Sequence, residues 1–317
     1  MADPQPLGSE PAAGLAWWRL ELAVPAELEE SLLWKLGALG IARVAVVHDP
    51  RTPHSHRLVA WLPAVDWPDL ERQRLAGALA PLGEPFGLSL PPLEWQAQHD
   101  EDWSSSWKQH WQPDPVGGRL LILPAWLEPP AELGERLVIR LDPGSAFGTG
   151  SHPTTRLCLE AIEALDLQSR WVADLGCGSG ILALGALQLG AAFAAAVDTD
   201  SLAVRATGDN ARLNGIGVGA GEPLQVALGS VEMLATLLGD RPADLLLCNI
   251  LAPVIETLAP RFQSVLSPGG VGLLSGLLVD QVPGLELALA ATGWRSQLVA
   301  AQGGWGLLEI RWAAAVA

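Results

Sequence analysis

The sequence predicts an α/β protein with a small α+β ferredoxin-like domain, followed by a doubly wound sheet of seven strands. Two observations predict this architecture. Residues 17–92 show the order strand, helix, strand, strand, helix, strand, which is the order of the split β-α-β unit. From about Glu135 onward, short apolar runs with strand character alternate with helical segments, as in a sheet joined by crossover helices.

Length and composition agree with a two-domain globular protein. The chain has 317 residues, of which 49% are hydrophobic and 17% are charged, so a large core is expected rather than disorder. The formal net charge is −16, which argues against direct binding of nucleic acid, because phosphate contacts need lysine and arginine. The three cysteines are scattered along apolar segments, so we expect neither a disulfide framework nor a metal site.

A cytoplasmic protein without a membrane segment is expected. The N-terminus lacks the basic and apolar regions of a signal peptide. Residues 175–197 carry no charge and are long enough to cross a bilayer. They contain Gln188 and several glycines, however, and we interpret them as a buried strand–helix–strand crossover.

The first domain is expected over residues 1–93 and is assigned to substrate recognition, because it contains no catalytic constellation. Its predicted strands and helices, in chain order, are residues 17–24, 27–39, 41–47, 57–62, 66–82 and 87–93. A connector rich in tryptophan is expected over residues 94–131. Trp103, Trp107 and Trp111 recur every four residues and would share one helix face. This face is expected to dock on a domain; the alternative is a surface for a partner protein.

The second domain is expected over residues 132–317 and holds the predicted sheet, which ends in a hairpin. A helix is predicted at residues 153–165, and strands at residues 137–141, 171–175, 194–198, 224–228, 244–249, 271–274, 296–300 and 305–311. Gly176, Asp198 and Asn249 all fall at the carboxyl ends of predicted strands. Ligands of doubly wound sheets bind outside these ends.

The run Val172-Ala-Asp-Leu-Gly-Cys-Gly-Ser-Gly180 predicts a strand followed by a glycine turn at a helix N-terminus. Glycines let the backbone approach a ligand closely, and Asp198 on the next strand could accept both hydroxyls of a ribose. A dinucleotide fingerprint would need glycine where Ile181 stands. The spacing resembles motif one of S-adenosylmethionine-dependent methyltransferases. Another kind of nucleotide binder is the alternative.

Two further segments carry candidate site residues. Three glycines between Asp142 and Thr155 would let this segment fold over a ligand, with threonine hydroxyls near a helix N-terminus. A simple capping turn would leave these glycines and His152 unexplained. Asn249 ends an apolar strand, and a buried amide needs hydrogen-bond partners. It either caps the next helix or holds an acceptor amine or the methionine part of a cofactor.

Together these motifs resemble the bacterial ribosomal protein L-eleven methyltransferase family. The resemblance rests on four segments in family order and spacing, which are Phe147-Gly-Thr-Gly-Ser-His-Pro-Thr-Thr155, Asp174-Leu-Gly-Cys-Gly-Ser-Gly-Ile-Leu182, Val197-Asp-Thr-Asp200 and Asn249-Ile-Leu251. Glu101-Asp-Trp103 and Trp107-Lys108 agree as well. Thr199 replaces a commoner isoleucine, and the serines at 104–106 are less typical of the family.

The resemblance implies a Rossmann-like methyltransferase sheet and S-adenosyl-L-methionine as cofactor. It implies methyl transfer to lysine side-chain and N-terminal amino groups of a basic, large-subunit ribosomal protein, and a monomeric enzyme is expected. Asn249 is the expected catalytic residue, and the expected cofactor-binding residues are Thr155, Gly176, Asp198, Asn249, Gly178, Phe147 and His152.

Three alternatives to this function stay open. The first is an N-methyltransferase acting on another protein or on a small-molecule amine. The second is a non-catalytic module that binds the cofactor and assists assembly, against which the intact glycine motif, Asp198 and Asn249 count. The third is an RNA methyltransferase, which the acidic charge disfavours.

Overall fold

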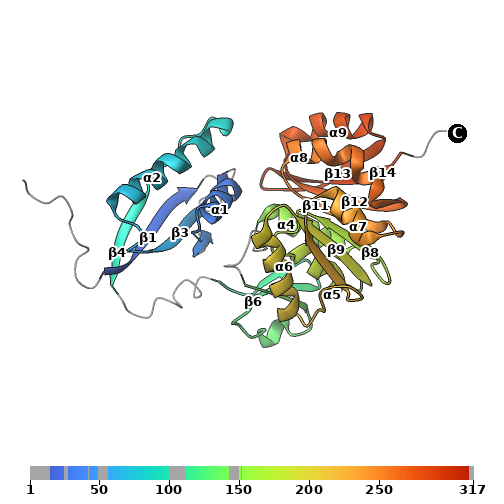
Figure 1. Cartoon of the computed structure of the whole chain (residues 1–317), viewed down its shortest axis with the longest axis horizontal. Coiled ribbons are helices and arrows are strands. Elements are labelled where there is room, and N and C mark those ends of the chain that lie inside the picture. Colours follow the sequence, from blue (N-terminus) through green and yellow to red (C-terminus); the bar gives the residue numbers. More distant parts are fainter. Residues whose placement is uncertain are drawn as a thin grey trace, which may run out of the picture. The chain divides into compact units, whose positions relative to one another are not determined.

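The computed structural model describes residues 15–24, 28–41, 43–48, 56–99, 111–142, 150 and 152–313. The chain divides into two compact units, Met1–Trp111 and Gln112–Ala317, which are coloured blue to cyan and green to red in Figure 1. Each unit contains its own buried core.

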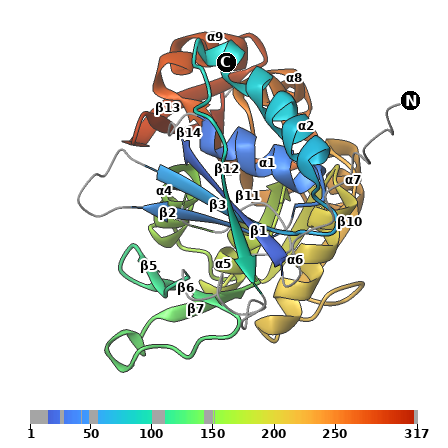
Figure 2. The same ribbon diagram turned by 90° about the vertical axis from the view of Figure 1, so that its left-hand side faces the viewer.

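The first unit contains a four-stranded antiparallel sheet with the strand order β2-β3-β1-β4. Its elements in chain order are β1 (Leu15–Val24), α1 (Glu29–Ala38), β2 (Val44–His48), β3 (His56–Pro63), α2 (Asp69–Leu79) and β4 (Glu94–His99). Leu20 and Leu22 of β1 alternate toward the same core as Leu32 of α1 and Leu75 of α2, so both helices cover one sheet face (Figure 2). The predicted ferredoxin-like order is confirmed.

The last strand of this unit was predicted wrongly. Residues 87–93 form no strand, and the fourth strand is β4, which pairs with β1. Pro91 and Pro92 lie within the predicted stretch, and proline has no backbone N–H to donate to a ladder. Because β4 completes the first sheet, the boundary between the units lies after Trp111 rather than at residue 93.

The second unit contains a seven-stranded sheet with the order β10-β9-β8-β11-β12-β14-β13. The strands are β8 (Trp171–Leu175), β9 (Phe193–Asp198), β10 (Leu224–Leu228), β11 (Ala243–Asn249), β12 (Leu266–Leu278), β13 (Trp294–Gln302) and β14 (Trp305–Trp312). The first five are parallel, whereas β14 runs antiparallel to both of its neighbours. The predicted doubly wound sheet with its terminal hairpin is therefore confirmed.

Helices cover both faces of this sheet (Figure 1). One face packs against α4 (Pro153–Glu163), α5 (Ile181–Gln188) and α6 (Ser201–Leu213). The other packs against α7 (Val231–Leu238), α8 (Ala252–Leu258) and α9 (Val282–Ala291). Along β8, Val172 faces the first layer and Ala173 the second, which explains why the central strands are almost entirely apolar, with the buried Asp174 of β8 as an exception. No helix in the described part of the chain has both the length and the apolar character needed to cross a membrane.

A separate three-stranded sheet precedes the large one. It consists of β5 (Asp114–Val116), β6 (Leu120–Pro124) and β7 (Leu137–Leu141), in that order. The strand predicted at residues 137–141 therefore exists as β7, but it pairs with β6 and not with the seven-stranded sheet. The region predicted as one connector, residues 94–131, is divided: β4 belongs to the first unit, and β5 and β6 belong to the second. Trp103 and Trp107 lie outside the described residues.

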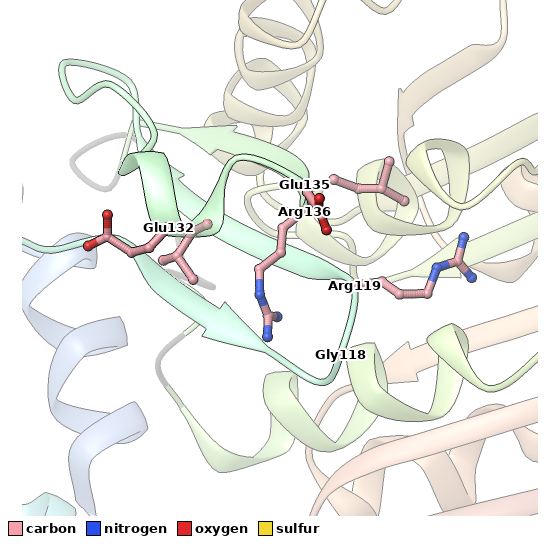
Figure 3. A pocket seen from close by; sticks show the side chains of 7 residues that line it. Gly118, Arg119, Glu132, Glu135 and Arg136 are labelled. Atoms are coloured by element: carbon pink, nitrogen blue, oxygen red, sulfur yellow. The ribbon is translucent and has the colours of Figure 1, made fainter.

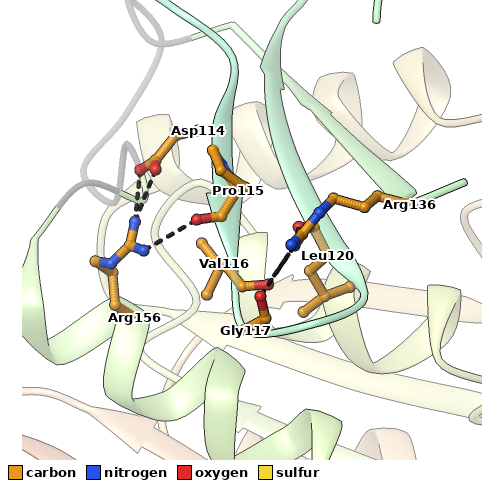
Figure 4. A network of polar contacts seen from close by, with 7 residues as sticks. All are labelled: Asp114, Pro115, Val116, Gly117, Leu120, Arg136 and Arg156. Atoms are coloured by element: carbon orange, nitrogen blue, oxygen red, sulfur yellow. Dashed lines mark hydrogen bonds and ion pairs between the residues drawn. The ribbon is translucent and has the colours of Figure 1, made fainter. Parts of the chain in front are cut away.

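Two arginines brace this small sheet (Figure 4). Arg136 Nη1 donates to three backbone carbonyls of the β5–β6 hairpin at 2.9–3.2 Å, those of Val116, Gly117 and Leu120. Arg156 of α4 donates to both carboxylate oxygens of Asp114 at 2.8 Å. The small sheet is thus fixed to the helix that carries Thr155.

Candidate functional site

The glycine turn between β8 and α5 requires its glycines for two reasons. Gly176, Gly178 and Gly180 have φ angles of 78°, 53° and 81°, which lie in the left-handed region that side chains disfavour. Space is also lacking. A Cβ on Gly176 would lie 2.4 Å from Ile250 Cγ2, and one on Gly180 would lie 2.8 Å from Thr207 Cγ2. The turn therefore keeps its backbone close to the tips of the neighbouring strands.

Asp198, at the end of β9, is held by two backbone groups. Its Oδ2 accepts the N–H of Gly178 at 3.0 Å, and its Oδ1 accepts the N–H of Asp200 at 2.9 Å. A carboxylate oxygen can accept two hydrogen bonds, so each oxygen keeps capacity for a ligand hydroxyl. Asp200 plays a different part, since it caps α6 and its Oδ1 accepts the N–H of Leu202 at 2.8 Å.

Asn249, at the end of β11, contacts the first turn of α4. Its Nδ2 donates to Thr155 Oγ1 at 3.4 Å, and Thr155 is only 2% exposed. The alternative that Asn249 caps the next helix is wrong, because the N-cap of α8 is Leu251 and no side chain caps it. Asn249 thus contacts a helix that covers one face of the sheet.

His152 begins α4 as its N-cap. Its Nδ1 accepts the N–H of Thr154 at 3.3 Å and lies 2.8 Å from Thr154 Oγ1. The ring also packs edge-to-face against Trp305, with 4.9 Å between the ring centroids. These contacts order the helix start, so the capping turn does account for His152, contrary to the expectation from the sequence. A cofactor contact of His152 stays a prediction. Phe147, also predicted to contact the cofactor, lies outside the described residues.

A second carboxylate, that of Asp174 in β8, is buried just before the glycine turn. Asp174 is 1% exposed, and its Oδ2 accepts the N–H of Ala183 at 3.0 Å. Burial raises the pKa of Asp174 to about 7, the hydrogen bond from Ala183 opposes this rise, and the charge of Asp198 adds to it. Asp174 therefore titrates near neutrality, unlike an ordinary aspartate.

The described site contains no group suited to nucleophilic catalysis. Burial raises the pKa values of the Cys158, Cys177 and Cys248 thiols, and the charge of Asp174 raises them further, so these cysteines are not thiolates. Within the described ranges no three His, Cys, Asp or Glu side chains gather as metal ligands. The site can bind and orient molecules through backbone, carboxylate and amide groups.

The structure places the three predicted strand-end residues on adjacent strands. Asp198 ends β9, Gly176 follows β8 and Asn249 ends β11. The chain runs from β8 outward to β9 and β10 and then crosses back to β11 on the other side of β8. The strand order reverses between β8 and β11, so this is the switch point at which doubly wound sheets bind ligands. Sequence reasoning missed Thr207 and Asn210 of α6, which bond to the glycine turn. Polar residues three positions apart on a helix with a buried face were the available signal.

A pocket of about 430 Å³ lies elsewhere, beside the three-stranded sheet (Figure 3). It is lined by Gly118, Arg119, Glu132, Leu133, Glu135, Arg136 and Leu137. None of the predicted site residues lines it, and it mixes charges of both signs. The strand tips around the glycine turn are therefore the better candidate for the functional site.

Comparisons with known proteins agree on one family. The model of the family described as ribosomal protein L11 methyltransferase (PrmA) matches residues 16–312. A ribosomal protein L11 methyltransferase of Synechococcus sp. (strain RCC307) is 61% identical over 300 residues, which cover 95% of this chain and 98% of the relative. One of Parasynechococcus marenigrum (strain WH8102) is 64% identical over 290 residues, which cover 92% and 99%.

A solved structure is similar as well. The crystal structure of a ribosomal protein L11 methylase from Lactobacillus delbrueckii subsp. bulgaricus is 34% identical and superposes with a TM-score of 0.57. The match covers 64% of this chain and 99% of that one.

Proposed function

Because the chain belongs to the ribosomal protein L11 methyltransferase family, we propose that it methylates amino groups of ribosomal protein L11. The donor is S-adenosyl-L-methionine, and the acceptors are lysine side chains and the N-terminal amine. The observation that carries the proposal is the Asp198 carboxylate. Two backbone N–H groups hold it at the tip of β9, beside a turn in which a Cβ on Gly176 or Gly180 would overlap Ile250 or Thr207.

These residues fit the proposed cofactor. Both Asp198 oxygens keep acceptor capacity, as two neighbouring ribose hydroxyls require. The glycine turn lets backbone lie against the ligand, and Thr155 and Asn249 lie on the other side of β8, where they would face the methionine part. The cofactor supplies a methyl group on a positively charged sulfur.

The acceptor amine must arrive uncharged, with its lone pair directed at the methyl carbon. A lysine amine has a pKa of about 10.4 in water, and loss of solvent at the site lowers that value. Since the described site offers no strong base, positioning supplies much of the rate enhancement.

Asn249 is proposed to orient the acceptor. Its Nδ2 is engaged by Thr155, while its Oδ1 accepts no hydrogen bond from the described residues. This oxygen can accept an amine N–H and thereby direct the nitrogen lone pair. Asn249→Ala is expected to lower kcat by more than about tenfold in a methyl-transfer assay. Full turnover with unchanged cofactor affinity would exclude this role.

The test of the function uses the intact protein, labelled S-adenosyl-L-methionine and unmethylated ribosomal protein L11, with mass mapping of the product. Methyl groups on lysine and N-terminal amines are expected. Label transferred only to other proteins or to small amines would favour the alternative N-methyltransferase. Cofactor binding without transfer to any acceptor would favour a non-catalytic module.

A further inference from the structure

The buried side of α6 carries polar residues at helical spacing: Thr207, Asn210 and Asn214. Thr207 and Asn210 are fully buried. Buried polar groups need hydrogen-bond partners, and the partners found here connect parts of the proposed cofactor site that are distant in sequence.

Asn210 bridges two of these parts with one amide group. Its Nδ2 donates to the carbonyl of Ser179, in the glycine turn, at 2.9 Å. Its Oδ1 accepts the N–H of Asp142 at 2.9 Å. Asp142 directly follows β7 and begins the segment that leads to His152 and Thr155. The same side chain therefore fixes the glycine turn relative to Asp142 at the end of β7.

Thr207 adds a second attachment to the glycine turn. Its Oγ1 donates to the carbonyl of Gly178 at 3.0 Å, so two successive carbonyls of the turn, at 178 and 179, point toward α6. In a trans peptide the C=O and N–H point in opposite directions. Because α6 holds these two carbonyls, the N–H groups of the same two peptide units are directed away from α6.

Asn214 offers a matched comparison one helical turn further along. Its Oδ1 accepts the N–H of Arg140 at 2.8 Å, and its Nδ2 donates to the carbonyl of Arg140 at 2.8 Å. Asn214 therefore ties α6 to β7, and its Nδ2 also donates to the backbone carbonyl of Asn210 at 2.7 Å. None of these bonds reaches the glycine turn.

We infer that Asn210 is a positioning residue for cofactor binding, which holds the glycine turn at a fixed position relative to Asp142 at the end of β7. This inference rests on the proposed function. Without Asn210 the carbonyl of Ser179 loses the hydrogen bond from the Asn210 amide, and the turn gains alternative orientations. The ligand must then order the turn when it binds, which costs affinity.

The test is calorimetric titration with S-adenosyl-L-homocysteine, well below the melting temperature of each variant. Asn210→Ala is expected to weaken binding about tenfold, the effect of one lost buried hydrogen bond. Asn214→Ala loses bonds of the same kind and is expected to stay within about twofold of the wild type, even though its melting temperature falls. If Asn210 only stabilised the fold, Asn210→Ala would lower the melting temperature as Asn214→Ala does, and the Kd for S-adenosyl-L-homocysteine would stay unchanged.

Two outcomes would overturn the inference: an unchanged Kd in Asn210→Ala, or equal weakening in Asn214→Ala. If Asn210→Ala does not fold, Asn210→Asp replaces it. This variant keeps an acceptor for Asp142, but in place of the donor it turns a carboxylate oxygen toward the carbonyl of Ser179. Two acceptors repel one another, so weakening at least as large is expected, and an unchanged Kd would again refute the idea. A wild-type protein that binds no S-adenosyl-L-homocysteine would instead refute the proposed function.

Discussion

At the scale of single residues, two neighbouring aspartates differ in what their oxygens do. Asp198 accepts one backbone N–H on each oxygen, whereas Asp200 caps α6. Because the backbone holds the Asp198 carboxylate before any ligand arrives, ligand binding need not order it. Of two aspartates only two positions apart, one thus has a carboxylate positioned for the proposed ribose contact and the other is a helix cap.

This difference can be measured with a matched pair of variants. Asp198→Ala is expected to weaken binding of S-adenosyl-L-methionine at least about a hundredfold, since two hydrogen bonds to a charged acceptor are lost. Asp200→Ala removes a cap and is expected to cost about 1 kcal/mol of stability with little effect on affinity. Calorimetry and urea unfolding check both. Unchanged affinity in Asp198→Ala would remove this residue from the ribose site.

Asp174 makes stability depend on pH. Its pKa is raised by burial from 3.8 to about 7, so the folded state holds a proton that the unfolded state releases above pH 3.8. The resulting stability is present at low pH and is lost as pH rises through about 7. The loss is on the order of a few kcal/mol, since one pKa unit corresponds to about 1.4 kcal/mol.

Asp174→Asn keeps an acceptor for the N–H of Ala183 but cannot ionise. The fall in unfolding free energy between about pH 4 and pH 8 is therefore expected to be smaller in this variant than in the wild type. Urea unfolding at several pH values measures the difference between the two proteins, which cancels the contributions of other groups. Parallel pH profiles would show that Asp174 does not titrate in this range.

At the scale of elements, the glycine turn joins β8 to α5, and it is crowded by Ile250, the residue that follows β11. Gly176 combines a positive φ with the nearby Ile250, whereas Gly215, after α6, has a φ of 69° and nothing within 4 Å of the place that a Cβ would occupy. Replacing each of these glycines by alanine and comparing the losses of stability separates the effect of a positive φ from the effect of crowding.

Gly215→Ala is expected to lose about 1 kcal/mol of unfolding free energy from backbone strain alone. Gly176→Ala is expected to lose roughly 1–3 kcal/mol more, because a Cβ would overlap Ile250, and to weaken cofactor binding as the turn shifts. Urea unfolding and calorimetry test this. Equal losses in the two variants would mean that Ile250 moves aside without cost.

At the scale of the whole molecule, the charge of −16 suits the proposed basic substrate. Opposite charges speed the encounter of two proteins, and salt screens this effect. We expect kcat/KM for the ribosomal protein to fall as ionic strength rises from about 0.05 M to about 0.5 M, while cofactor affinity changes less. Steady-state kinetics in a salt series test this, and a rate independent of salt would mean that the charge serves only solubility.

Sequence reasoning reached the large sheet and its strand-end residues because these depend on local patterns. The apolar runs that end at Leu175, Asp198 and Asn249 became β8, β9 and β11, since strands buried on both faces must be apolar throughout. It failed at β4, β5 and β6, which all lie in the stretch predicted as a connector. β4 is largely polar and β5 has only three residues, whereas β6 is an apolar run that was overlooked. The partner of β4 could not be read from a local pattern, because β4 pairs with β1, far back along the chain.

The sequence by itself therefore determined where the backbone must bend and which polar groups follow each central strand, because glycine conformation and strand burial are local requirements. Only the tertiary structure decided that β7 leaves the large sheet, that Asn249 meets Thr155, and that Asn210 joins the glycine turn to Asp142. The hydrogen bonds of Asn249 with Thr155, and of Asn210 with Ser179 and Asp142, span 94, 31 and 68 residues of chain. Hydrogen bonds over such separations produce no repeating pattern in the sequence, because their partners meet only after the sheet and helices have packed.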